Sequence, residues 1–98
     1  KHFLFPTEVT FSNDTIKQHT IMEVVTPDRP GLLARIGQIL LSHDLLLLNA
    51  RITTLGERVE DVFFLTQEDG QPLCDGELCR NIADDICREL DDHPQINA

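Results

Sequence analysis

The sequence predicts a two-layer α+β sandwich, in which two helices pack on one face of a four-stranded antiparallel sheet. Two observations predict this fold. Four segments have strand patterns and two have helical patterns, in the order strand, strand, helix, strand, strand, helix. Each helix carries one apolar stripe, which it buries by packing against a sheet. The length of 98 residues suits a single domain spanning residues 1–98.

The first pair of strands precedes the first helix. Val9 and Phe11 alternate with polar residues, which predicts an edge strand over about residues 7–12. The run 21–26 predicts a second strand, which the turn-forming residues from Pro27 onward end.

The first helix follows this break and ends near His43-Asp44. Its apolar residues recur at helical spacing: Leu32, Leu33, Ile36, Ile39 and Leu40. Pro30 suits the first helical turn, and Asp28 is close enough to cap the helix or to interact favourably with its dipole. Gly37 costs about 1 kcal/mol relative to Ala inside a helix, so we expect close packing against the sheet there.

The second half of the chain repeats the strand, strand, helix order. Residues 45–55 predict a long strand, 56–58 a hairpin turn and 59–66 the returning strand. Asp75 is a suitable cap for a second helix. The stripe of that helix consists of Leu78, Ile82, Ile86 and Leu90.

The end of the chain departs from the common form of this architecture. A ferredoxin-like sandwich normally ends with a strand after its second helix, but residues 91–98 make a poor strand and predict a tail. We therefore expect the strand at 7–12 to replace the usual last strand at the edge of the sheet. The start at Lys1, without Met, predicts a piece of a longer protein.

Strand alternation predicts which side chains face the helices. The helix-facing set is Val24, Leu48, Ile52, Val62 and Phe64. The opposite, open face then carries Glu23, Asn49, Arg51, Thr53 and Asp61 together with Ile21, Val25, Leu47 and Phe63. A face that mixes apolar and charged side chains favours its use as a partner surface.

Composition excludes several classes of function. The net charge is −9 with no basic run, which disfavours nucleic acid and anionic membrane surfaces. An RNA-recognition domain shares this layout but needs sheet aromatics flanked by basic residues, whereas the central strands offer only Phe63 and Phe64. No apolar run reaches the roughly 18–20 residues of a membrane span.

Reactive constellations are absent as well. There is no nucleophile motif and no Gly-rich phosphate loop, so we expect no catalytic residue and no cofactor. The His43-Asp44 pair is expected to be a solvated turn, since a metal needs three or four converging ligands. Three cysteines without zinc-site spacing, Cys74, Cys79 and Cys87, predict reduced thiols and a cytosolic protein.

One loop combines residues that a ligand site would need. It joins the second strand to the first helix and reads Asp28-Arg29-Pro30-Gly31-Leu32-Leu33. A helix N-terminus beside a glycine exposes backbone N–H groups that suit a carboxylate, and Asp28 can accept from an ammonium group. From these residues alone, a ligand site and a tight turn without a ligand both stay open.

This loop, placed between an apolar strand and an amphipathic helix, resembles the signature of the ACT domain family. ACT domains are regulatory modules that bind amino acids and pair with one another, and the resemblance covers residues 20–90. It implies a ligand between the loop and the following strand, often a strand of a partner domain. The residues it marks as ligand-binding are Asp28, Arg29, Gly31, Leu32 and Leu33, with Asn49 as the facing polar group.

The segment 49–64 is also similar to the last ACT domain of the bacterial PII uridylyltransferase family. This similarity implies glutamine as the ligand, a cytoplasmic parent enzyme, and control of uridylyl transfer to and removal from the PII protein in nitrogen regulation. The catalytic domains of that family are absent from these residues, so the chain itself is not expected to be an enzyme. The alternative is an ACT module that binds no ligand and only pairs, as a homodimer or with a neighbouring ACT domain.

Overall fold

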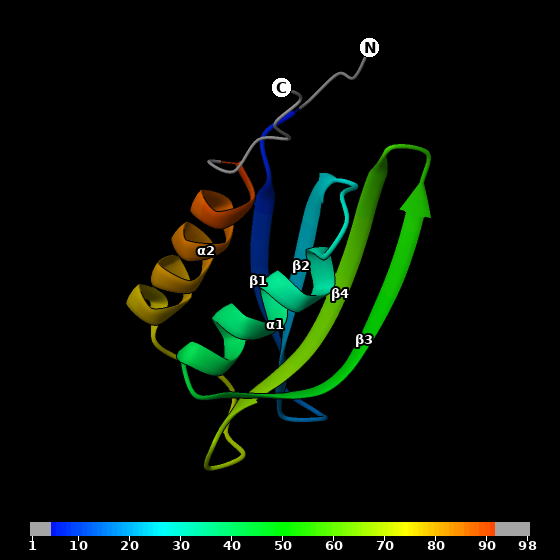
Figure 1. Cartoon of the computed structure of the whole chain (residues 1–98). Helices are drawn as coiled ribbons and strands as arrows, with labels where there is room; N and C mark the ends of the chain where they lie inside the picture. Colours follow the sequence, from blue (N-terminus) through cyan, green and yellow to red (C-terminus); the bar gives the residue numbers. More distant parts are fainter. Residues whose placement is uncertain (1–4, 92–98) are drawn as a thin grey trace.

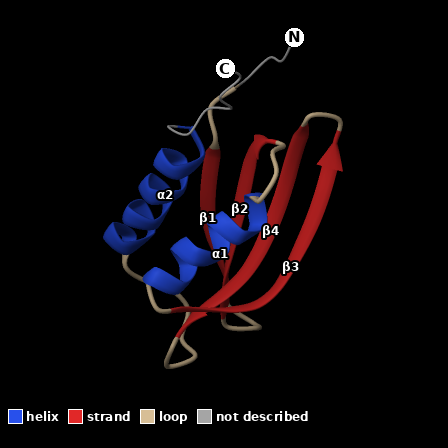
Figure 2. Ribbon diagram, viewed as in Figure 1, coloured by secondary structure: helices blue, strands red, loops and turns tan. Residues whose placement is uncertain are grey.

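Four antiparallel strands form one sheet, and both helices lie on the same face of it (Figures 1 and 2). The structure is a computed structural model and describes residues 5–91. The elements are β1 (Glu8–Asp14), β2 (His19–Pro27), α1 (Leu32–Ser42), β3 (Leu45–Leu55), β4 (Arg58–Gln67) and α2 (Gly76–Asp91). The strand order is β1-β2-β4-β3, with every neighbouring pair antiparallel, which confirms the predicted fold class.

The N-terminal strand occupies one edge of the sheet, as predicted. β1 pairs along its whole length with β2, and Phe11 lies opposite Met22. Val9 and Phe11 pack against the core from this edge. The predicted tail begins with Asp91, which is instead the last residue of α2, and its remaining residues, 92–98, lie outside the described part.

The core lies between the helices and the sheet face that they cover. Its buried side chains are Met22, Val24, Leu32, Ile36, Leu40, Leu45, Val59, Phe63, Leu65, Leu73, Ile82, Ile86 and Leu90. The stripe predicted for the second helix is confirmed in the core, with three of its four members fully buried and Leu78 packed beside them.

The predicted orientation of β4 is wrong by one residue. Asp61 and Phe63 point to the helices and are buried, whereas Val62 and Phe64 lie on the open face and are half-buried. Apolar residues occupy both alternating sets of β4, so hydrophobicity alone could not choose between its faces. The predicted orientation therefore placed Asp61 on the open face, where the structure does not have it.

A bulge interrupts β3 between Leu47 and Asn49. The extra residue there is Leu48, which is exposed. The prediction that Leu48 faces the helices is therefore wrong. Leu47 pairs with the buried Leu65, so the prediction that it lies on the open face is wrong too. Beyond the bulge, Ile52 pairs with Asp61 on the helix side, as predicted.

The start of α1 also differs from prediction. Gly31 is the N-cap, with a left-handed φ of 74°, and no side chain within residues 5–91 hydrogen-bonds to the cap. Asp28 is therefore not the capping residue, and Pro30 precedes the first helical turn instead of forming it. The turn is made by backbone geometry that glycine alone adopts readily.

Gly37 does not pack closely against the sheet. A Cβ atom built on it would meet no heavy atom within 4 Å, so the predicted close approach is wrong.

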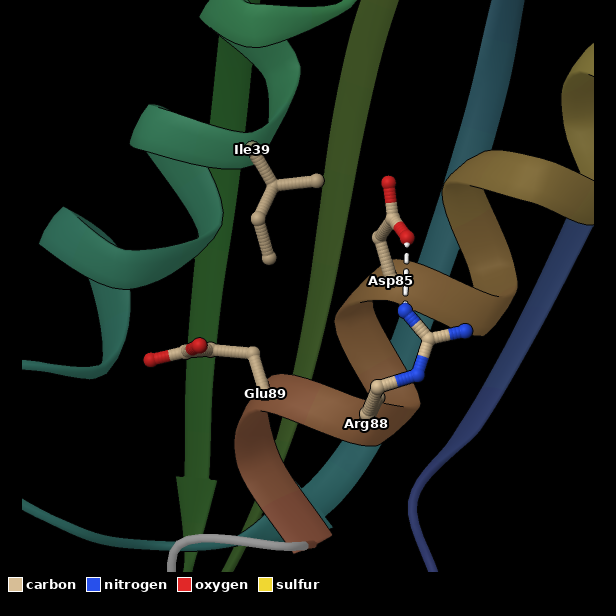
Figure 3. A pocket seen from close by; sticks show the side chains of 4 residues that line it. All are labelled: Ile39, Asp85, Arg88 and Glu89. Carbon is tan, nitrogen blue, oxygen red and sulfur yellow. Dashed lines mark hydrogen bonds and ion pairs between the residues drawn. The ribbon is translucent and has the colours of Figure 1, made fainter.

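Side-chain contacts fix the remaining helix ends. Asp75 caps α2 as predicted, since its carboxylate accepts from the Glu77 N–H at 2.9 Å. His43 Nε2 lies 2.7 Å from Asp85 Oδ2 and joins the end of α1 to α2, so His43 is not the solvated residue that was predicted. A hollow of about 240 Å³ lies nearby between the helices, lined by Ile39, Asp85, Arg88 and Glu89 (Figure 3).

Candidate functional site

A cavity of about 280 Å³ lies where the β2–α1 loop meets β3 and β4. It is lined by Asp28, Gly31, Leu32, Leu33, Ala34, Ile52, Thr54, Val59 and Asp61. In Figure 1 the β2–α1 loop and the β3–β4 turn lie at the same end of the sheet. The cavity thus joins a helix N-terminus to the helix-facing side of two strands.

Two backbone contacts hold the loop in place. The Asp28 N–H donates to the Glu57 carbonyl at 2.8 Å, which fastens the loop to the β3–β4 hairpin. The Gly31 carbonyl accepts from the Arg35 N–H at 3.1 Å and starts the hydrogen-bond ladder of α1. The amides of the first helical turn, at residues 32–34, therefore have no acceptor within the helix and form the positive end of its dipole.

Asp61 gives the cavity a buried carboxylate. The residue is 1% exposed, and neither carboxylate oxygen has a hydrogen-bond partner among residues 5–91. Burial raises the pKa of Asp61 above its ordinary value. A weak polar contact with the Thr53 backbone offsets this rise in part, and the negative charge of Asp28 adds to it. The cavity therefore presents amide donors at the start of α1 and acceptors on β4 and the loop.

Four of the six predicted site residues line this cavity: Asp28, Gly31, Leu32 and Leu33. Arg29 does not. Its guanidinium donates to the Leu90 carbonyl at the end of α2, which ties the loop to the second helix. Asn49 does not line it either: it pairs with Phe64, its side chain is exposed, and its amide oxygen accepts from the neighbouring Ala50 N–H at 2.8 Å.

Sequence reasoning missed the strand side of the cavity. Ile52, Thr54, Val59 and Asp61 contribute it. The signal for Asp61 was available, because an acidic residue within an apolar strand is unusual unless it is paired or functional. Asp61 was overlooked because the predicted orientation of β4 placed it on the open face of the sheet.

The described residues give little support to a metal site, a membrane-spanning helix or a reactive cysteine. Within residues 5–91 no three His, Cys, Asp or Glu side chains are grouped as metal ligands would be, and none of the helices there is long and apolar enough to cross a membrane. The three cysteines are free thiols. Burial raises the pKa of both Cys79 and Cys87, which is the opposite of what activates a thiol nucleophile.

Known proteins resemble the chain over most of its length. A family model described as the ACR family N-terminal ACT domain matches residues 15–92. Three bacterial proteins named bifunctional uridylyltransferase/uridylyl-removing enzyme match 90 residues, or 92% of the chain. Identity is 58% for Stutzerimonas stutzeri (strain A1501), 60% for Pseudomonas fluorescens (strain SBW25) and 58% for Pseudomonas putida (strain W619). The chain spans 10% of the length of these relatives.

The family match covers the sheet from β2 onward and both helices, including every residue that lines the cavity. Its extent agrees with the two-layer fold and with the loop that leads into α1. The chain therefore belongs to the ACT domain family.

Proposed function

We propose that this chain is an amino-acid-sensing regulatory domain that binds free glutamine in the cavity between the β2–α1 loop and β4. The observation that carries the proposal is the cavity itself, which joins the start of α1 to the buried Asp61 carboxylate. A helix N-terminus suits an α-carboxylate, and the facing carboxylates suit an α-ammonium group. A free amino acid carries both charges on neighbouring atoms.

The size of the cavity supports a ligand of this kind. Pockets for drug-sized ligands are about 300–1,000 Å³. The volume here, about 280 Å³, lies below that range and suits a single amino acid.

The regulatory context of the proposal comes from the family resemblance, and the names of the relatives supply the two enzyme activities. A domain of this chain's kind in a cytoplasmic uridylyltransferase/uridylyl-removing enzyme would let glutamine bias the balance of the two activities on the PII protein. Such a ligand shifts an equilibrium only by its differential affinity for the two states.

Isothermal titration calorimetry of the 98-residue chain tests the proposal. Glutamine should give saturable heat, and glutamate should bind more weakly because its side-chain carboxylate adds negative charge to an acidic cavity. A folded sample that gives no heat with millimolar glutamine would refute direct binding by this chain.

The exposed edge of the sheet favours a second function, pairing with another ACT domain. β3 is an edge strand with unpaired backbone groups on its outer side. It also exposes five large apolar side chains: Leu46, Leu47, Leu48, Ile52 and Leu55. A second copy paired at this edge would cover them.

Sedimentation velocity over a range of concentrations tests pairing. A dimer that Leu48→Asp dissociates supports the edge, and a dimer that forms equally with and without glutamine supports a module that only pairs. A monomer at every concentration would exclude pairing between copies of this chain.

A further inference from the structure

We propose that Asp61 selects the ligand by its positively charged amino group, and so restricts this cavity to amino acids as against the corresponding acids without an amine. The inference rests on the proposed function and deepens it. It assigns ligand selection to a strand residue outside the β2–α1 loop.

Asp61 is a buried carboxylate without a partner of ordinary hydrogen-bond geometry. Only 1% of the residue is exposed, and among residues 5–91 its two oxygens have only a weak polar contact with the Thr53 backbone. Buried polar groups in folded proteins are nearly always hydrogen-bonded, and a buried charge is costly unless it is paired. An orphaned buried carboxylate that lines a cavity is therefore complementary to a donor brought by a ligand.

The cavity wall is acidic. Among residues 5–91, none that line the cavity is Lys, Arg or His, so this part of the wall supplies no cation to Asp61. Asp28 lines the same cavity and interacts repulsively with Asp61. Two carboxylates facing one space favour a cation between them.

The surroundings of Asp61 are apolar. On the sheet Asp61 lies between its two cross-strand partners, Val24 on β2 and Ile52 on β3. Val24 is fully buried, so the carboxylate sits among apolar side chains where water screens charge poorly. In such a place a ligand with an ammonium group is strongly preferred over one that lacks it.

A metal ion is a poorer occupant than an ammonium group. In the part of the chain that the structure describes, Asp28 and Asp61 are the only acidic residues that line the cavity, and no His or Cys lines it. Two carboxylates supply a small part of the six to eight oxygen ligands of calcium.

The experiment compares two ligands on three proteins by calorimetry. The ligands are glutamine and glutaramate, which is glutamine without its amino group. The proteins are the wild-type chain, Asp61→Asn, and the control Asp84→Asn, which makes the same change at an exposed position on α2. Circular dichroism establishes that each variant is folded.

Wild type and Asp84→Asn should bind glutamine about tenfold or more tightly than glutaramate, as expected for a charged hydrogen bond. Asp61→Asn should lose most of that preference, chiefly by weaker binding of glutamine. If folded Asp61→Asn keeps the full preference, the role of Asp61 is wrong while glutamine sensing stands. If the wild-type chain binds neither ligand, both proposals fail.

Discussion

Asp61 is a buried acidic side chain in an otherwise apolar part of the fold. It stands in a strand whose other helix-facing residues, Val59, Phe63 and Leu65, are apolar. A hydrophobic residue of similar volume would stabilise this position, because it would remove the desolvation of a charge. The proposed contact with a ligand ammonium group would account for a carboxylate there.

The pKa of Asp61 predicts how stability depends on pH. Burial raises the pKa of Asp61, so folding favours the protonated carboxyl group. The contribution of this group to the free energy of unfolding is present at pH values below its ordinary pKa of 3.8, and it is lost as pH rises through the higher pKa of the folded chain. The ionised form of Asp61 is thus less favourable in the folded chain than in the unfolded chain. Asp61→Asn should therefore raise the free energy of unfolding at neutral pH by on the order of 1 kcal/mol, because it removes the charge but leaves a buried polar group.

Urea unfolding of wild type and Asp61→Asn checks this prediction at neutral pH and at a pH below the carboxyl range. The advantage of the variant should shrink in acid. A variant that is less stable than wild type at neutral pH would contradict the account of Asp61.

The two glycines of the α1 region provide a matched pair of substitutions. A Cβ atom would meet nothing at either position, so only the backbone conformation distinguishes them. Gly31→Ala should destabilise the chain by about 1 kcal/mol, because its φ of 74° is left-handed. Gly37→Ala should stabilise it by about 1 kcal/mol through helix propensity. Thermal unfolding checks both, and shifts of the same sign would be inconsistent with the geometry of Gly31.

At the scale of elements, the sequence predicted where helices and strands lie better than which way they face. The alternation of Val9 and Phe11 and the stripe of α2 identified β1 and α2, because each has one apolar set only. β4 has two such sets, and β3 contains a bulge that no alternation pattern reveals. The loop half of the cavity was predictable because residues 28–33 combine a glycine with a helix start and carry the family resemblance. The strand half depends on the orientation of β4, which the sequence did not reveal.

The contact between α1 and α2 predicts a response to acid at the scale of elements. The hydrogen bond from His43 lowers the pKa of Asp85, and Arg88 lowers it further. This stabilisation is therefore present above the ordinary value of 3.8 and is lost as pH falls through the lower folded-state value. The Asp85 side chain is 39% exposed, so solvent screening limits the contribution of this contact to the free energy of unfolding to less than about 1 kcal/mol.

Asp85→Asn should reduce the stability of the chain at neutral pH and have little effect in strong acid. Chemical unfolding at both pH values, with Asp84→Asn as a control on the same helix, checks this. An equal loss at both pH values would show that the ion pair is not the cause.

At the scale of the whole molecule, the β2–α1 loop connects the cavity with the rest of the fold. Asp28 fastens it to the β3–β4 hairpin, and Arg29 fastens it to the end of α2. The loop therefore contacts both the cavity and the last helix, and if the proposed ligand binds there, this arrangement would let binding change the packing of the domain.

The most direct test of glutamine binding is to observe where it occurs. In a glutamine titration followed by amide NMR of the 98-residue chain, the resonances of Gly31, Leu32, Leu33 and Asp61 should shift saturably. Those of Glu23 and Arg51, on the open face, should stay in place. Saturable shifts confined to the open face, or none at millimolar glutamine, would contradict the assignment of the cavity as the amino-acid site.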